Sequence, residues 1–222
     1  MHSRLELTAI LFLNGRVDID FCEKYIFENY SWLPIYCADG AYSKVKNSSL
    51  LNKNIKKVIG DFDSCKVESN DLFLINHDQN STDFEKCLEY LLDQNYTKVI
   101  VFGGSEGEMD HFLANISVAL LYKNKLTIEF VDSYSWYFFI PKVFNVENVK
   151  GKMFSIMPFG CVKNIYYNGL KYPLYGQDLE FGITTGARNC AIENEVSISY
   201  SCGEILLFIS HKKYKDRLDA VL

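Results

Sequence analysis

The chain has 222 residues, of which 48% are hydrophobic, and it carries a formal net charge of −5. This length and composition are typical of a globular protein with either one large domain or two small ones. Because the sequence has no long basic run and no nucleic-acid motif, it does not indicate a polyanionic partner.

The first part of the chain, residues 1–140, alternates short apolar runs with longer amphipathic segments. This pattern predicts an α/β domain with a largely parallel sheet, and the short connections indicate a compact doubly wound fold. The apolar run at 7–13 is too short to span a membrane, and it is typical of a buried strand. We predict strands at 7–13, 34–38, 57–60, 72–76, 98–103 and 126–132, and helices at 18–29, 40–47, 82–95 and 109–124.

The second part, residues 141–222, is rich in aromatic and β-branched residues, with recurring glycine turn signals and no long helical period before residue 211. This composition predicts an all-β sandwich domain, with the domain boundary between residues 133 and 150, near Pro141.

The seven cysteines include no C-x-x-C pair, and their odd number argues against a complete disulfide framework. The sequence therefore predicts reduced thiols in a cytoplasmic protein.

Polar motifs directly follow four of the predicted strands: "CADGAY" with Asp39, "GDFDS" with Asp61 and Asp63, "HDQNSTDFEK", and "GGSEGEMDH". In extended backbone Asp61 and Asp63 point the same way and repel each other by roughly 4 kcal/mol at ~4 Å and a dielectric of ~20. A divalent cation such as Mg²⁺ would offset this repulsion, whereas a solvated turn is the simpler alternative. Because ligands of open parallel sheets bind beyond the carboxyl ends of the strands, four such motifs on one edge favour a site.

The motif "TDFE" has a local explanation as well as a functional one. Thr82 and Glu85 form a capping-box pattern, Asp83 suits the first turn of a helix, and Lys86 is spaced to pair with Asp83. Together with "GDFDS", a helix start that carries an acid and a lysine favours binding of metal and phosphate.

The segment "GGSEG" offers close backbone approach and N–H groups that suit a nucleotide, although it is neither a Walker A nor a G-x-G-x-x-G motif. Asp110 and His111 then open a helix, where Asp110 is a candidate cap and His111 a candidate half-buried polar residue. The other histidines form no metal-ligand spacing with His111, which argues against zinc.

The motifs "ADGA", "GDFDS", "DQNSTDFEKCL" and "DHFLANI", in this order, resemble the thiamine pyrophosphokinase family, and "GLKYPL" with "FGITTGARN" resembles its substrate-binding β-domain. The resemblance implies an α/β catalytic domain, a C-terminal β-sandwich and a homodimer with active sites between subunits. It also implies transfer of the pyrophosphoryl group of ATP to the hydroxyl of thiamine, which gives thiamine diphosphate and AMP.

The resemblance also implies roles for single residues. Asp61, Asp63 and Asp83 would hold Mg²⁺ and act in catalysis together with Lys86. The implied nucleotide-binding set is Asp39, Ser64, Gln79, Thr82, Gly103, Gly104, Asp110 and His111, and the implied thiamine-binding set is Tyr172, Arg188 and Asn189. An aromatic side chain, either Tyr172 or Trp136, would offer a platform for the cationic substrate.

Three positions differ from the family pattern: Glu106 replaces a glycine, Glu108 an arginine and Arg188 a serine. A positive charge at 188 would repel thiamine unless Arg188 points away or contacts the transferred phosphates. This leaves two alternatives, a pyrophosphokinase of the same fold that acts on another hydroxymethyl substrate such as a pterin alcohol, and a non-catalytic sensor of nucleotide or thiamine diphosphate.

Overall fold

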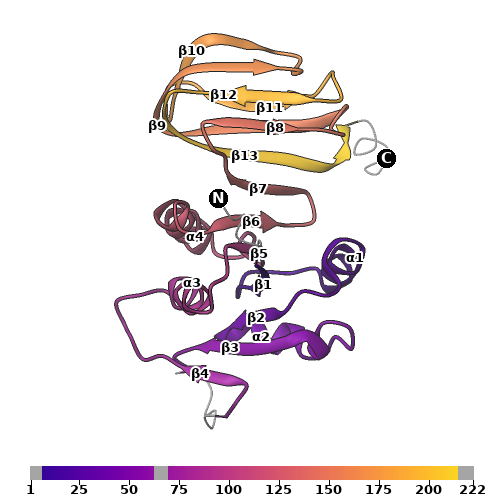
Figure 1. The fold of residues 1–222 in the computed structure, drawn as a ribbon, viewed down its shortest axis with the longest axis vertical. Coiled ribbons are helices and arrows are strands. Elements are labelled where there is room, and N and C mark those ends of the chain that lie inside the picture. The colour runs from indigo at the N-terminus through magenta and orange to yellow at the C-terminus, as the bar shows by residue number, and fades with distance from the viewer. Residues whose placement is uncertain (1–6, 63–69, 215–222) are drawn as a thin grey trace, which may run out of the picture. The chain divides into compact units, whose positions relative to one another are not determined.

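The structure is a computed structural model that describes residues 7–62 and 70–214, so the predicted site residues Asp63 and Ser64 lie outside the described part. The chain forms two compact units, Met1–Ser133 and Tyr134–Leu222 (Figure 1). The division lies at the N-terminal end of the range 133–150 and before Pro141, because the strand at 135–139 pairs within the second unit. Among the described helices, none is long and apolar enough to cross a membrane.

The first unit is built on a parallel sheet in which every strand pairing of the described residues is parallel. Its strands are β1 (Thr8–Phe12), β2 (Ile35–Ala38), β3 (Ile55–Gly60), β4 (Phe73–Ile75), β5 (Lys98–Phe102) and β6 (Thr127–Val131). They run in the order β4-β3-β2-β1-β5-β6, so the direction of winding reverses between β1 and β5. The predicted α/β class and all six predicted strands are confirmed.

Helices cover both faces of this sheet, which explains why central strands such as β1 and β5 are apolar and buried over most of their length. The elements between the strands are α1 (Ile19–Tyr30), α2 (Asp39–Val45), the short 3₁₀ helix η1 (Asn52–Asn54), α3 (Asp83–Asp93) and α4 (Met109–Tyr122). Figure 1 shows α3 and α4 on one face of the strands and α1 and α2 on the other. This is the doubly wound arrangement that the sequence predicts.

The named elements in the described part of the second unit are all strands, as predicted. Its strands are β7 (Ser135–Phe139), β8 (Val143–Val146), β9 (Lys152–Asn168), β10 (Leu174–Glu180), β11 (Gly186–Cys190), β12 (Val196–Ser199) and β13 (Cys202–Lys213). The long strand β9 joins two antiparallel groups, because it pairs with β11 and β13 along its first part and with β10 and β12 along its last part. Side chains of both groups enclose one apolar core, which makes the unit a β-sandwich.

Candidate active site

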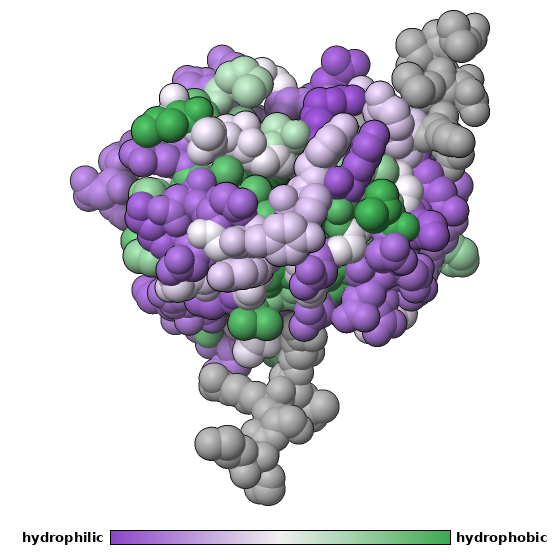
Figure 2. Space-filling model, turned by 90° about the horizontal axis from the view of Figure 1, so that it is seen from above, coloured by the Kyte–Doolittle hydropathy of each residue, from purple (hydrophilic) through white to green (hydrophobic). Residues whose placement is uncertain are grey.

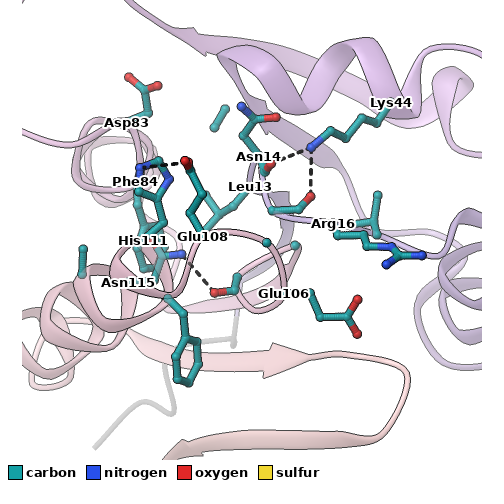
Figure 3. Close-up of a pocket in the computed structure, with 18 of the residues that line it drawn as sticks. Leu13, Asn14, Arg16, Lys44, Asp83, Phe84, Glu106, Glu108, His111 and Asn115 are labelled. Atoms are coloured by element: carbon teal, nitrogen blue, oxygen red, sulfur yellow. Dashed lines mark hydrogen bonds and ion pairs between the residues drawn. The ribbon is translucent and has the colours of Figure 1, made fainter.

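A cavity of about 660 Å³ opens at the carboxyl ends of the parallel strands, where the winding reverses between β1 and β5. Its lining comes mainly from the loop after β1 (residues 13–17), the loop after β5 (residues 103–108) and the first turns of α4. A switch point of this kind is where open α/β sheets bind ligands, and the volume suits a nucleotide-sized ligand. Figure 3 shows the side chains that face it.

Glycines let the loops after β1 and β5 interlock beside the cavity. The amide of Gly15 donates to the carbonyl oxygen of Gly103 at 3.0 Å, and the amide of Arg16 donates to the carbonyl oxygen of Glu106 at 3.3 Å. Gly103 has a φ of 69°, and a Cβ at this position would overlap the carbonyl oxygen of Leu13. The first glycine of "GGSEG" is therefore required by close backbone packing as well as by its φ.

Lys44 connects α2 to the loop after β1 by hydrogen bonds. Its Nζ donates to the carbonyl oxygens of Asn14 at 2.5 Å and Gly15 at 3.0 Å, as the dashed lines in Figure 3 show. Partial burial lowers the pKa of Lys44 from its usual value. A Cβ at Gly40 would overlap the side chain of Asn14, so the glycine of "ADGA" leaves room for this asparagine.

The sequence prediction missed the segment "NGR" at 14–16 and Lys44, although both belong to the cavity lining. The available signal was that "NGR" directly follows β1, and so lies at the same edge of the sheet as the four acidic motifs.

The structure brings Asp61 and Asp83 together around Lys86. The Lys86 side chain is buried, and its Nζ lies 3.4 Å from Oδ1 of Asp83 and 3.7 Å from Oδ2 of Asp61. Asp39, the first residue of α2, packs against the end of β3, where a Cβ at Gly60 would lie 2.5 Å from the Cβ of Asp39. Three motifs that are far apart in the sequence thus converge at neighbouring strand ends, as predicted from the parallel sheet.

The capping box at the start of α3 is present and fixes the backbone that carries Asp83. The amide of Glu85 donates to Oγ1 of Thr82 at 3.2 Å, and the amide of Thr82 donates to Oε2 of Glu85 at 2.8 Å. Thr82 and Asp83 also line the cavity, so the local and the functional interpretations of "TDFE" apply to the same residues.

Several predicted nucleotide-site residues line the cavity, namely Thr82, Gly103, Gly104 and His111, whereas Gln79 and Asp110 are exposed outside its lining. The N-cap of α4 is Glu108, so the expectation that Asp110 caps this helix is wrong. Asp110 instead accepts a hydrogen bond from the amide of His111 at 3.0 Å. His111 is mostly exposed, rather than half-buried, and its Nε2 lies 3.7 Å from Glu108.

Among the described residues, no group of three histidine, cysteine or acidic side chains gathers as a metal site. The described part of the acidic cluster offers the carboxylates of Asp61 and Asp83, and Asp63 of the same motif lies outside it. Carboxylate oxygens are the donors that Mg²⁺ prefers, and Mg²⁺ usually takes only one or two of them from the protein. The donor set therefore fits this ion.

In the second unit, the predicted residue Asn189 is buried and holds Tyr172 in place. Its Nδ2 donates to the carbonyl oxygen of Tyr172 at 2.8 Å, and its Oδ1 accepts from the amides of Tyr172 at 3.1 Å and Cys190 at 2.9 Å. The ring of Tyr172 is 63% exposed and lies 5.3 Å from the ammonium of Lys171. Asn189 thus fixes the backbone at Tyr172, whose ring is exposed and has the Lys171 ammonium over it.

Arg188 and Trp136, the other candidates of the second unit, contact aromatic side chains of that unit. The Arg188 guanidinium lies 6.0 Å from the ring of Tyr214, and the Arg188 amide donates to Oγ of Ser155 at 3.0 Å. Trp136 stacks on Phe138 with ring centroids 4.7 Å apart and packs against the sandwich core. Trp136 therefore has a packing role.

Comparisons with known proteins assign the chain to a family. The family model described as "Thiamin pyrophosphokinase, catalytic domain" matches residues 26–130, and the one described as "Thiamin pyrophosphokinase, vitamin B1 binding domain" matches residues 142–205. The thiamine pyrophosphokinase of Bacillus subtilis (strain 168) is 27% identical over 168 residues, which cover 69% of this chain and 78% of that protein. Thiamine pyrophosphokinase 2 of Arabidopsis thaliana is 25% identical over 209 residues, 80% of this chain and 78% of that protein.

Solved structures share the fold. The crystal structure of thiamine pyrophosphokinase from Bacillus subtilis superposes with a TM-score of 0.77 and 19% identity, covering 92% of this chain and 99% of that one. Thiamin pyrophosphokinase from Candida albicans gives a TM-score of 0.76 and 16% identity, covering 92% and 89%. Two matching family models, one on each structural unit, and relatives that span most of the chain lead to the same assignment. The chain belongs to the thiamine pyrophosphokinase family.

Proposed function

We propose that the cavity between the ends of β1 and β5 is the ATP site of a thiamine pyrophosphokinase. The reaction transfers the pyrophosphoryl group of ATP to the hydroxyl of thiamine and gives thiamine diphosphate and AMP. The observation that carries the assignment of the site is the buried Lys86 held between Asp61 and Asp83, with Asp83 and the start of α3 in the cavity wall.

In this reaction the hydroxyl oxygen of thiamine forms a bond to the β-phosphorus of ATP. The bond from that phosphorus to the oxygen bridging the α- and β-phosphates breaks, and AMP leaves with the bond's electron pair. Phosphoryl transfer needs mainly positioning and neutralisation of charge. We assign Lys86 to neutralise the transferred phosphates, and a carboxylate of the Asp61–Asp83 cluster to take the hydroxyl proton.

Asp61, Asp63 and Asp83 would hold a divalent cation, which we propose to be Mg²⁺. When bound, the ion supplies positive charge beside the phosphate oxygens. Lys86 then has a second role, because its ammonium keeps Asp61 and Asp83 close together. We place the remaining members of the predicted nucleotide set, Asp39, Ser64 and Gln79, near the phosphates as part of the same proposal.

We propose that the second unit binds thiamine through the exposed ring of Tyr172, which suits a flat cation. Asn189 would act indirectly, by fixing the backbone of Tyr172. The Arg188 guanidinium lies near the ring of Tyr214, which favours the alternative in which its charge points away from the cationic substrate over contact with the transferred phosphates.

We further propose a cytoplasmic homodimer with active sites between subunits. Exposed aromatic side chains on the second unit support this assembly, among them Tyr166 and Tyr175, which face each other across β9 and β10, and Phe181 just beyond. Figure 2, which views the molecule from above, shows hydrophobic residues in separate groups among hydrophilic ones. Light scattering after size-exclusion chromatography tests the dimer, and a mass near the 25.6 kDa of one chain would contradict it.

Neither alternative from the sequence receives support. The matching family models and the relatives are those of thiamine pyrophosphokinases, and none is described as acting on a pterin or as a sensor.

Product analysis of the purified protein with ATP, Mg²⁺ and thiamine tests the function. Equal amounts of AMP and thiamine diphosphate are the expected result, and a parallel reaction with a pterin alcohol should give neither AMP nor a phosphorylated pterin. A protein that forms AMP only with the pterin alcohol, or that forms no product with either, would overturn the proposal.

A further inference from the structure

Arg16 is a charged residue of the cavity wall that the family motifs do not include. It lies in the loop after β1, and its backbone is fixed because its amide and the amide of the preceding Gly15 both donate to the loop after β5. Within residues 7–62 and 70–214, no hydrogen bond, ion pair or ring contact involves the Arg16 guanidinium. A rigid backbone thus presents an unpaired guanidinium at the cavity.

The other charges of the cavity make this guanidinium important for an anionic ligand. The lining includes the carboxylates of Asp83, Glu106 and Glu108. Its arginine and lysine side chains are those of Arg16 and Lys44. The Lys44 ammonium already donates to two backbone carbonyls of the loop after β1. Of the arginine and lysine side chains in the described lining, Arg16 is therefore the one whose charged group is available to bind a phosphate.

The position of Arg16 indicates which phosphate it meets. In Figure 3 the side chains of Arg16 and Asp83 lie on opposite sides of the cavity. The transferred phosphates belong beside Asp83 and Lys86, so the part of the nucleotide that remains with adenosine lies toward Arg16. A guanidinium suits phosphate because its N–H groups form charge-assisted, often bidentate, hydrogen bonds.

We propose that the guanidinium of Arg16 binds the α-phosphate of ATP, the phosphate that stays on adenosine when the pyrophosphoryl group leaves. This inference rests on the proposed function. Negative charge builds on the α-phosphate as its bridging oxygen separates from the β-phosphorus, and Arg16 then stabilises both bound ATP and the departing AMP.

Calorimetric titration of the whole protein with ATP, AMP and adenosine, in the presence of Mg²⁺, tests the inference. In the Arg16→Gln variant the affinities for ATP and AMP should fall about tenfold or more, the size expected for a hydrogen bond to a charged group, while adenosine binding stays unchanged. Arg16→Lys should restore part of the loss, because it keeps the charge without the bidentate geometry. The matched control is Lys24→Gln, which removes an exposed cation of α1 and should change nothing.

The outcomes separate this inference from the proposed function. If the unaltered protein makes thiamine diphosphate but Arg16→Gln binds AMP as tightly as before, only the role of Arg16 is overturned. An equal loss of adenosine affinity would also overturn it, because Arg16 would then contact the base or the ribose. If the unaltered protein binds no adenosine nucleotide and makes no product, the proposed function fails, and this inference fails with it.

Discussion

Lys86 shows how one buried side chain can be held by the fold and also be placed for the catalytic role that we propose. Its side chain is 2% exposed, and burying an ammonium costs free energy unless opposite charges compensate. Asp61 and Asp83 provide that compensation, and Lys86 in turn reduces the repulsion between them. The three side chains therefore depend on one another, and removal of Lys86 would leave two carboxylates near the cavity without their shared cation.

Replacing Lys86 by methionine keeps the length and apolar stem of the side chain but removes the charge. We expect kcat to fall by about a hundredfold or more, the scale seen when one electrostatic stabiliser of a transition state is lost. Steady-state kinetics measures this, with circular dichroism to confirm that the variant is folded. Lys53→Met removes an exposed lysine and should keep full activity, whereas a fully active Lys86→Met would exclude the proposed role.

Asn189 presents a different case, because its amide acts on the position of another residue. Asn189→Ala removes three hydrogen bonds to backbone groups of Tyr172 and Cys190. Since partly buried backbone groups lose their hydrogen bonds, we expect about 1–3 kcal/mol lower unfolding free energy, together with a raised KM for thiamine and an unchanged KM for ATP.

Urea unfolding and kinetics with each substrate varied provide these numbers. Asn168→Ala is the matched control, because Asn168 is exposed and its side chain makes one long hydrogen bond of 3.4 Å. If the KM for ATP rises as much as that for thiamine, Asn189 has no specific link to the thiamine site.

At the scale of elements, interlocked loops rather than side chains shape the cavity. Gly103 combines a positive φ with backbone contact to the loop after β1, whereas Gly107 has a φ of 100° but no atom closer than 3.9 Å to a built Cβ. The two glycines lie in the same loop. A comparison of their alanine variants therefore separates the free-energy cost of backbone strain from that of steric overlap.

Gly107→Ala should cost about 1 kcal/mol of unfolding free energy for the left-handed conformation alone. Gly103→Ala should cost about 1–3 kcal/mol more, because the loops after β1 and β5 must also move apart. Denaturant titration of both variants measures the difference. Equal losses would mean that the close packing at Gly103 does not stabilise the fold.

Local sequence signals predicted the individual elements of the first unit well. The capping box "TDFE" placed the start of α3 at Asp83, and apolar runs placed the six strands within one or two residues at each end. The start of α4 at Met109 was also predicted, but its cap was not, because Glu108 makes no side-chain capping bond that a pattern could reveal. In the second unit, pairing between distant segments defines the strands, so sequence predicted the class but not strands such as the 17-residue β9.

The sequence was sufficient to predict those residues of the candidate site that directly follow the strands. It was not sufficient to predict those that come together only because of the order of the strands in the sheet. Asp61 and Asp83 follow from the rule that carboxyl ends of parallel strands share an edge. Arg16 and Lys44 were missed because nothing local in the sequence says that β5 lies beside β1, and this neighbour relation creates the cavity.

At the scale of the whole molecule, the two units differ in the burial of their cysteines. In the described part of the first unit Cys22, Cys37 and Cys87 are buried, whereas Cys202 in the second unit is exposed. Burial raises the pKa of Cys22 and of Cys37 to about 12, and it raises the pKa of Cys87 as well. Among the cysteines in residues 7–62 and 70–214, we therefore expect iodoacetamide at pH 8 to label Cys202 first and to leave these three thiols unmodified until the protein unfolds.

Peptide mass spectrometry over time identifies the labelled sites, and early labelling of Cys37 would contradict the expectation.

The burial of Cys22 and Cys37 also predicts that the stability of the fold depends on pH. A folded-state pKa above the unfolded value of 9.0 means that the buried thiols favour the folded state fully below pH 9. This contribution is lost as the pH rises from about 9 toward 12, so the urea midpoint should decrease over that range.

We propose that the acidic cluster at the carboxyl ends of the parallel strands catalyses pyrophosphoryl transfer. The most direct measurement compares AMP and thiamine diphosphate formation by the unaltered protein, by Asp61→Asn and by the exposed control Asp71→Asn, all with ATP, Mg²⁺ and thiamine. We expect equal amounts of both products from the unaltered protein and from Asp71→Asn, and at least about a hundredfold lower rate from folded Asp61→Asn. Unchanged product formation by Asp61→Asn would contradict it.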